Sequence, residues 1–373
     1  MPPPDVKRTH RSNLVRPELL TVPADVHGSA SRAELAAYGL DPADVIDFSV
    51  STNPLGIAPS VLQAVQGTDW GRYPGDDEPA LVAALAAQNN VQPDRVILGN
   101  GSSELLWLLA LATLRPGDTV AVQGPTFGEY ARCARVFGAH VVVTGAGTDD
   151  ITARLLFVCN PNNPTGAYLD GDEVTHLVSA NPQRLVIVDE AYRPFVDVPW
   201  PSETLLEYDN VVLLRSLTKD HGLPGLRLGY LLAAPEVARA VTAARPPWSV
   251  NAGALRAGLA ALDPEAQAHL ARARAVVQES RALLTAGFTA LGYRVWPAAA
   301  NFVLVEVGDG AAFRQALLPH GLVVRDCASF GLPGCIRVAC RLPAQCLRLL
   351  ETVATMPVTG IGHRGDQDLT SAK

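Results

Sequence analysis

Residues 210–230, NVVLLRSLTKDHGLPGLRLGY, contain an apolar run that ends abruptly in a polar, glycine-bearing segment. Other short β-branched or aliphatic runs occur at 95–98, 119–122, 140–143, 154–158, 184–188 and 230–233, and helical patterns separate most of them. Runs without polar alternation are typical of strands that are covered on both faces. We therefore predict an α/β fold whose large domain has a mainly parallel seven-stranded sheet sandwiched by helices.

The pattern changes beyond residue 251. A long Ala/Arg/Leu-rich stretch over 252–290 predicts helix, and strand-like runs follow at 293–297, 301–307, 322–326 and 335–340. This mixture predicts a smaller α+β domain built from 27–58 and 251–356, beside a large domain over 59–250. Residues 1–26 and 357–373 lack hydrophobic periodicity, so we expect flexible tails there.

Composition narrows the function. Of the 373 residues, 48% are hydrophobic and 18% charged, and the net charge is −7. A globular protein with a small-molecule substrate fits these values, whereas a nucleic-acid surface needs a clustered basic face. The six cysteines form no C-x-x-C pair, and no apolar run is long enough to span a bilayer. We expect a reduced, cytoplasmic protein with no membrane partner and no metal site.

Lysine is scarce in this chain. Only three of the 30 basic residues are lysines, namely Lys7, Lys219 and Lys373. Lys7 and Lys373 lie in the predicted tails, so Lys219 is the single lysine that the folded body can use. Any chemistry that requires an amine therefore points to Lys219, although a lone lysine is more often an ordinary surface residue.

Polar motifs follow five of the predicted strands: GNGSSELL, QGPTFGEY, CNPNNPTG, DEAY and RSLTKD. In α/β sheets, ligands bind beyond the carboxyl ends of the strands, so these motifs predict one shared site. Gly101, Ser102 and Ser103 open a helix, where backbone N–H groups can hold an anion. Taken alone, this turn would be merely a capped helix.

The segment around Lys219, together with GLRLGY, resembles the cofactor-binding segment of fold-type I aminotransferases, which use pyridoxal-5′-phosphate (PLP). The resemblance implies that Lys219 holds PLP as a Schiff base and then moves protons at the substrate Cα. Asp189 is placed to keep the pyridine nitrogen protonated, which makes the ring an electron sink. Asn163 and Tyr192 match the residues that contact the PLP phenolate oxygen.

Further cofactor contacts come from the same resemblance. Ser216 and Arg227 would complete a phosphate site with Gly101, Ser102 and Ser103, while Phe127 would stack on the ring unless it is simply a core aromatic. Tyr73 in GRYPG matches a tyrosine that reaches the phosphate from a neighbouring subunit. This match implies a homodimer with shared active sites.

The resemblance also implies which residues contact the substrate. Arg337 matches the arginine that binds the substrate carboxylate, and Asn53 lies in a substrate-side loop. The segments at 27–56, 246–251, 300–306 and 322–341 look most like threonine-phosphate decarboxylases of cobalamin biosynthesis, followed by histidinol-phosphate aminotransferases. Both relatives act on phosphorylated amines, so Arg325 and His27 are candidates for a second anion pocket. His27 could equally be a satisfied loop histidine.

The choice between decarboxylation and transamination stays open at this point. It depends on which bond at Cα stands perpendicular to the cofactor ring, and a sequence does not contain that angle. HGS at 27–29, Asp220 and His221, and the segment before His27 depart from the decarboxylase pattern. A regulatory or sugar-aminating homologue and a non-catalytic interaction protein are the remaining alternatives. Sugar-aminating enzymes usually lack the counterpart of Arg337.

Overall fold

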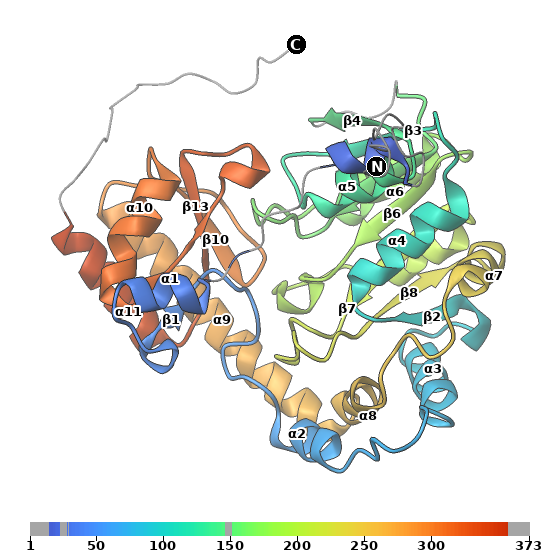
Figure 1. Ribbon diagram of the computed structural model, residues 1–373, viewed down its shortest axis with the longest axis horizontal. Helices are drawn as coiled ribbons and strands as arrows, with labels where there is room; N and C mark the ends of the chain where they lie inside the picture. Colours follow the sequence, from blue (N-terminus) through green and yellow to red (C-terminus); the bar gives the residue numbers. More distant parts are fainter. Residues whose placement is uncertain (1–14, 23–27, 29, 146–150, 357–373) are drawn as a thin grey trace, which may run out of the picture.

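The computed structural model describes residues 15–22, 28, 30–145 and 151–356. These residues form two lobes of unequal size that lie side by side (Figure 1). Most of the predicted tails, 1–26 and 357–373, lie outside the described residues. Residues 15–22 are an exception, because Pro17–Thr21 forms a short 3-10 helix and the Arg16 guanidinium donates to the carbonyl of Val136.

The large lobe contains a seven-stranded sheet within the described chain, which confirms the predicted fold class. Its order is β2-β8-β7-β6-β5-β3-β4, and all pairs are parallel except those of β8. β8 runs antiparallel because a loop, not a crossover helix, joins it to β7. The strands are β2 (Val96–Gly99), β3 (Thr119–Gln123), β4 (His140–Thr144), β5 (Leu155–Cys159), β6 (Leu185–Asp189), β7 (Val211–Ser216) and β8 (Gly229–Ala233).

Helices cover both faces of this sheet. Successive strand residues alternate between two buried clusters: Leu156 packs with one cluster and Phe157 with the other. The Leu156 cluster includes α2 (Pro59–Gln66), α3 (Asp77–Gln88), α6 (Gly171–Ser179) and α8 (Ala252–Ala261). The Phe157 cluster includes α4 (Ser102–Thr113), α5 (Glu129–Val136) and α7 (Pro235–Ala244). Double coverage explains the continuous apolar runs.

The small lobe has its own core and joins distant parts of the chain. Its antiparallel sheet has the order β12-β13-β10-β9, and a short parallel pair, β1-β11, ties residues 46–47 to residues 322–323. The strands are β1 (Ile46–Asp47), β9 (Arg294–Val295), β10 (Phe302–Glu306), β11 (Leu322–Val323), β12 (Arg325–Asp326) and β13 (Cys335–Ala339). The helices are α1 (Arg32–Ala37), α10 (Gly310–Leu317) and α11 (Pro343–Thr355).

The predicted helical stretch at 252–290 is two helices. α8 ends before Pro264, which begins α9 (Pro264–Ala290), because proline is favoured in the first helical turn and excluded from an interior. Leu255 of α8 packs in the large-lobe core, whereas Phe288 of α9 packs in the small-lobe core. These contacts favour a domain boundary inside α9 over one at residue 251. The division into domains stays a prediction.

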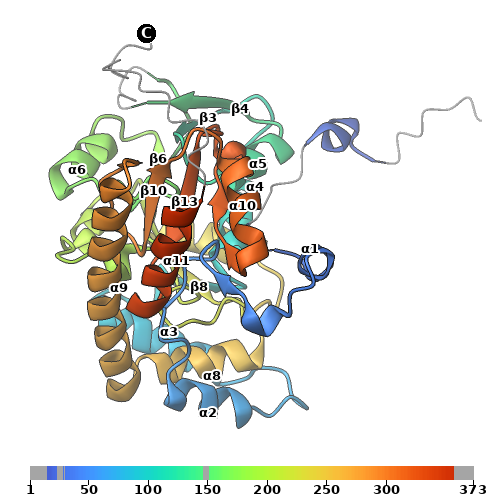
Figure 2. The ribbon, with the colours of Figure 1, turned by 90° about the vertical axis from the view of Figure 1, so that its left-hand side faces the viewer.

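α9 runs along both lobes (Figure 2). Of the helices in the described chain, none is both long and apolar enough to cross a membrane.

Candidate active site

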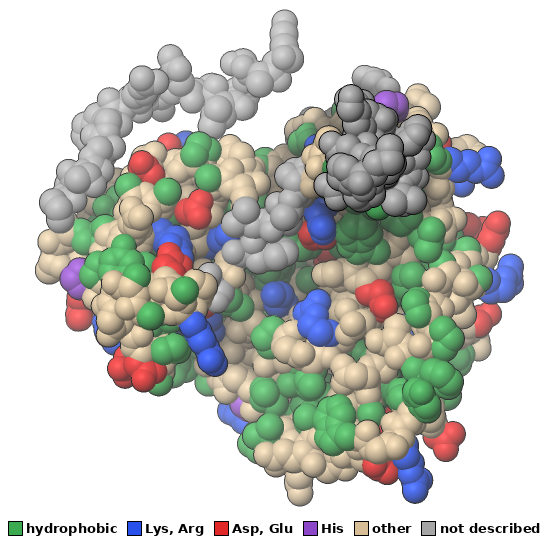
Figure 3. Space-filling view, viewed as in Figure 1, with side chains coloured by type: hydrophobic (Ala, Val, Ile, Leu, Met, Phe, Trp, Pro, Cys, Tyr) green, Lys and Arg blue, Asp and Glu red, His purple; other side chains and the backbone are tan. Residues whose placement is uncertain are grey.

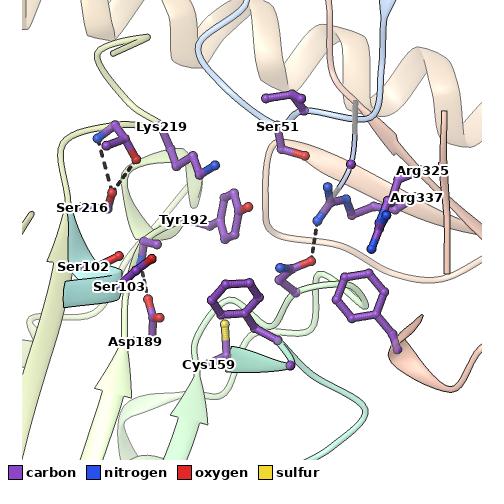
Figure 4. Close-up of a pocket in the computed structure, with 18 of the residues that line it drawn as sticks. Ser51, Ser102, Ser103, Cys159, Asp189, Tyr192, Ser216, Lys219, Arg325 and Arg337 are labelled. Carbon is purple, nitrogen blue, oxygen red and sulfur yellow. Dashed lines mark hydrogen bonds between the residues drawn. The ribbon is translucent and has the colours of Figure 1, made fainter. Parts of the chain in front are cut away.

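A cavity of about 390 Å³ lies where the carboxyl ends of the large-lobe strands face the small lobe. Basic side chains are visible in the hollow between the lobes (Figure 3). Eleven of the residues predicted from the sequence line this cavity: Ser102, Ser103, Phe127, Asn163, Asp189, Tyr192, Ser216, Lys219, Arg227, Arg325 and Arg337. Several of them are shown in Figure 4. The motifs after the five strands thus meet in one place.

Lys219 lies in the loop after β7, and its side chain is partly buried in the cavity wall. Burial and the charges of Arg337 and Arg227 together lower the pKa of this amine to about 8, while Asp189 opposes the shift. About a tenth of the amine is therefore uncharged at pH 7. Only the uncharged amine has a lone pair, so Lys219 is suited to nucleophilic attack on a carbonyl carbon.

Asp189 ends β6 and is 5% exposed. Its Oδ2 accepts a hydrogen bond of 2.8 Å from the Tyr130 hydroxyl, and its Oδ1 accepts one of 3.0 Å from the Ala191 N–H. Burial raises the pKa of Asp189, and the Tyr130 hydrogen bond opposes this shift. A cationic ring nitrogen on the cavity side would complete the set of partners that keep a buried carboxylate ionised.

The amino end of α4 forms a corner whose backbone geometry suits an anion. Gly101 adopts φ +80°, and a side chain there would collide with the Arg227 guanidinium. A Cβ at Gly229 would lie 2.5 Å from the Ser102 nitrogen, so this corner requires glycines for close approach. Arg227 itself has φ +61°, a conformation that costs a non-glycine residue energy. The backbone is thus arranged to present N–H groups and a guanidinium together.

Asn163, Tyr192 and Phe127 also line the cavity. The Arg337 Nη1 donates to the Asn163 Oδ1 at 2.5 Å, so the amide nitrogen is the Asn163 atom able to donate to a ligand. Burial raises the pKa of the Tyr192 hydroxyl to about 12, although the Arg337 charge opposes the shift. Tyr192 therefore stays a hydrogen-bond donor at neutral pH. Phe127 meets Tyr130 edge to face, with ring centroids 5.5 Å apart.

Two arginines form the end of the cavity on the small-lobe side. Arg325 of β12 lies opposite Arg337 of β13 in the strand register, so both side chains project from the same face. Arg325 Nη2 donates to the Ser329 Oγ at 2.7 Å, and its guanidinium lies 5.4 Å from the Phe330 ring centroid. Arg337 Nη2 donates to the Ser49 carbonyl at 2.7 Å, while its buried Nε has no partner among the described residues.

The remaining predicted residues lie elsewhere. Gly101 flanks the cavity as the residue before α4. Asn53 is buried behind the Lys219 segment and does not line the cavity. Tyr73 is 76% exposed and stacks on Trp248, with ring centroids 4.4 Å apart. His27 falls outside the described residues, although Gly28 lines the cavity.

Sequence reasoning missed several cavity residues: Ser49, Ser51, Tyr130, Cys159, Thr218, Ser329 and Phe330. Tyr130 was detectable, because it lies in the same QGPTFGEY motif as Phe127. Ser51 gave no signal: its buried hydroxyl has no hydrogen-bond partner in the described chain, which only a structure can show.

The residues present fit PLP. An aldehyde needs the Lys219 amine, a ring nitrogen needs a carboxylate such as Asp189, and a phosphate needs the α4 amino end with Arg227. All these groups line or flank one cavity, and the glycines at the corner let the Arg227 guanidinium and the Ser102 N–H approach closely.

The family model for aminotransferase class I and II matches residues 43–353. The chain belongs to this family. A histidinol-phosphate aminotransferase from Symbiobacterium thermophilum is 41% identical over 326 residues, which cover 83% of this aminotransferase and 90% of the relative. The predicted enzyme class and cofactor are thereby confirmed.

Two solved structures have the same fold. The histidinol-phosphate aminotransferase from Sinorhizobium meliloti in complex with PLP has a TM-score of 0.80 at 24% identity, and the alignment covers 92% of this aminotransferase and 96% of that chain. The L-threonine-O-3-phosphate decarboxylase from Porphyromonas gingivalis has a TM-score of 0.76 at 25% identity, with coverage of 83% and 99%. The relatives thus favour the aminotransferase alternative over the decarboxylase that the sequence motifs favoured.

Proposed function

We propose that this enzyme transfers the amino group of a phosphorylated amine of the histidinol-phosphate type to a 2-oxo acid such as 2-oxoglutarate. The observation that carries this proposal is the pair of buried arginines, Arg325 and Arg337, across the cavity from Lys219. Two cations at this end suit substrates that bring anions. The identity to histidinol-phosphate aminotransferases supports transamination over decarboxylation.

The two arginines suit a reaction with two alternating substrates. A guanidinium can bind a carboxylate or a phosphate through two parallel hydrogen bonds. Arg337 has its Nε available and is the candidate for a carboxylate. Arg325 lies beside the Ser329 hydroxyl, and a guanidinium with a hydroxyl is a suitable pair for a phosphate. A phosphorylated amine and glutamate could therefore use the same end of the cavity in turn.

The residues around the cofactor divide the chemistry. PLP, when bound, supplies a ring that delocalises the electron pair left at the substrate Cα. Lys219 is positioned to accept a proton from the substrate Cα and to donate it to another atom. Its pKa of about 8 allows both steps near neutral pH. Asp189 holds its charge against the ring nitrogen. Asn163 and Tyr192 provide hydrogen-bond donors.

Decarboxylation of threonine phosphate is the second candidate. That substrate carries a carboxylate and a phosphate on one molecule, so it could engage Arg337 and Arg325 simultaneously. The likeness to the Porphyromonas gingivalis decarboxylase supports this alternative.

A homodimer with shared sites is also part of the proposal. Trp70, Tyr73 and Trp248 are 63%, 76% and 55% exposed, and Leu62 of α2 is 43% exposed nearby in the sequence. Large exposed aromatic side chains are typical of protein interfaces. Tyr73 does not line the cavity of its own chain, so a phosphate contact from Tyr73 would have to be made in a second copy.

The test uses the purified enzyme with PLP. Incubation with histidinol phosphate and 2-oxoglutarate should release glutamate, and incubation with threonine phosphate should release no carbon dioxide. Histidinol without its phosphate is the matched control and should react far more slowly. Carbon dioxide from threonine phosphate, with no glutamate from the first mixture, would replace the proposal by the second candidate.

A further inference from the structure

The turn at Asn53–Gly56 lies directly against the segment that carries Lys219. Asn53 is 3% exposed, and two of its donors contact successive carbonyls of that segment. Its backbone N–H donates to the Lys219 carbonyl at 2.7 Å, and its side-chain Nδ2 donates to the Asp220 carbonyl at 2.8 Å. One buried residue, through its backbone and its side chain, therefore holds the two peptides that follow the amine-bearing residue.

The turn is itself rigid. The Asn53 Oδ1 accepts from the Leu55 N–H at 2.8 Å, and the Asn53 carbonyl accepts from the Gly56 N–H at 3.1 Å. Gly222 has φ +66°, and a Cβ there would lie 2.9 Å from the Gly56 carbonyl carbon. His269 of α9 also contacts the turn, with its Nε2 3.2 Å from the Gly56 oxygen. The Lys219 segment cannot shift without moving this turn.

The chain just before the turn is held by the substrate side of the cavity. Arg337 donates to the Ser49 carbonyl at 2.7 Å, and Arg341 donates to the Asp47 and Val50 carbonyls at 2.7 and 2.8 Å. Ser49 and Asn53 are separated by only three residues. The candidate carboxylate anchor and the amine are thus joined by one short, buried stretch of chain.

From these contacts we propose that Asn53 is a positioning residue, which sets the place of the Lys219 amine relative to the anchor Arg337. It touches neither the cavity nor a substrate, so it acts through the lysine. The sequence had placed Asn53 in a substrate-side loop, and its contacts assign it to the backbone of the lysine segment instead. This inference needs the lysine chemistry of the family but no particular substrate.

The amine would respond measurably if Asn53 were changed. The Lys219 pKa is lowered by burial and by Arg337 and Arg227, while Asp189 opposes them. If the segment were released, the amine could move toward solvent and away from the guanidinium groups. Its pKa would then rise toward the ordinary lysine value.

The test compares Asn53→Ser with Asn210→Ser. Serine can still accept from the Leu55 N–H, but it is too short to reach the Asp220 carbonyl. Asn210 is the matched control, because its Nδ2 also donates to backbone carbonyls, those of Val178, Asn181 and Arg184, away from the cavity. Cofactor-free protein is mixed with PLP between pH 6 and 10, and the rate at which the visible absorbance band appears is measured.

For Asn53→Ser, the midpoint of this pH profile should rise by at least about half a unit. In the loaded enzyme, kcat should fall about tenfold while KM changes less than about twofold, since a misplaced catalytic group affects the chemical step more than binding. Hydrogen exchange should increase in residues 217–226. Asn210→Ser should keep the wild-type midpoint. A folded Asn53→Ser protein with the wild-type midpoint and kcat would overturn the proposal.

A second variant, Asn53→Asp, tests the same proposal if Asn53→Ser does not fold. Asn53→Asp keeps the size and the acceptor for Leu55 but places an oxygen against the Asp220 carbonyl. It should increase hydrogen exchange over 217–226 and lower kcat about tenfold. Wild-type exchange and kcat in this variant would overturn the proposal. The absorbance and exchange measurements involve no amino donor, so their outcome is independent of whether the proposed substrate is correct.

Discussion

The cofactor-facing wall of the cavity comes from consecutive strand ends of one sheet, whereas the substrate-facing wall joins chain segments from opposite ends of the sequence. Asp189 ends β6, and Lys219 lies three positions beyond the last residue of β7. Ser49 and Arg337, in contrast, are 288 positions apart and meet through one hydrogen bond. The first wall is a local consequence of sheet topology, and the second depends on how the small lobe is assembled.

This difference separates two kinds of function. The cofactor-facing wall carries chemistry that every amino donor requires, so damage there should affect all substrates alike. In the proposed function, the substrate-facing wall recognises the anion of the substrate, so damage there should discriminate between substrates.

The largest effect is expected for Lys219→Ala. Turnover of every amino donor should fall by more than about 10³-fold, because the nucleophile and the proton-transfer group are lost together. The visible absorbance of the enzyme with PLP should disappear as well, as measured by spectrophotometry. Retained turnover of any donor would contradict the assignment of the amine.

Asp189→Asn should lower kcat about 10²-fold for all donors, since a neutral amide cannot hold the ring nitrogen cationic. Tyr130→Phe, which removes the hydroxyl bonded to Asp189, should lower it about tenfold, the value of one hydrogen bond to a charged group. Steady-state kinetics with two different donors would check both values. A fall in kcat for only one donor would contradict the inference that the cofactor-facing wall serves all donors alike.

Arg325→Gln should act selectively. The KM for histidinol phosphate should rise about 10²-fold, because a charge-assisted contact to phosphate is lost, while the KM for glutamate should change less than about fivefold. Arg337→Gln is the matched variant, and it should raise the KM for glutamate more than the KM for histidinol phosphate. If both variants raised the KM for both substrates equally, the two arginines would not have separate roles in binding phosphate and carboxylate.

The smallest effect concerns stability of the cofactor-free protein. The folded pKa of Lys219, about 8, lies below the unfolded value near 10.5, so burial of the cation destabilises the fold most below pH 8. This penalty disappears as the pH rises toward 10.5. Lys219→Met should therefore stabilise the protein by about 3 kcal/mol at pH 7. Thermal unfolding at pH 7 and pH 10 would test this prediction. An equal gain in stability at both pH values would show that burial of the lysine cation is not the cause.

Much of the cofactor-facing wall was predictable because its signals are local. A buried apolar run followed by a polar turn defines both the strand and the position of its last side chain, as for Asp189 and Lys219. All seven large-sheet strands occur within a residue or two of the predicted runs. The fold class thus follows from short-range patterns, whereas the cofactor roles of these residues were inferred from the resemblance to aminotransferases.

The rest could not be predicted because it depends on long-range packing. Asn53 lies in a loop that the sequence places near the substrate, yet its donors face the backbone of Lys219 and Asp220. The pairing of Arg325 with Arg337 requires the register of β12 and β13, which no local pattern fixes. The break between α8 and α9 was visible only as Pro264 inside an otherwise helical composition.

The scarcity of lysine has a practical consequence for handling this enzyme. In ordinary proteins, reactive aldehydes also attach to surface amines, which blurs any count of occupied sites. Here the described part of the chain offers one lysine, and the other two lie near the chain ends. Borohydride trapping followed by mass spectrometry of the internal peptide should therefore report stoichiometry directly, with almost no background from adventitious labelling.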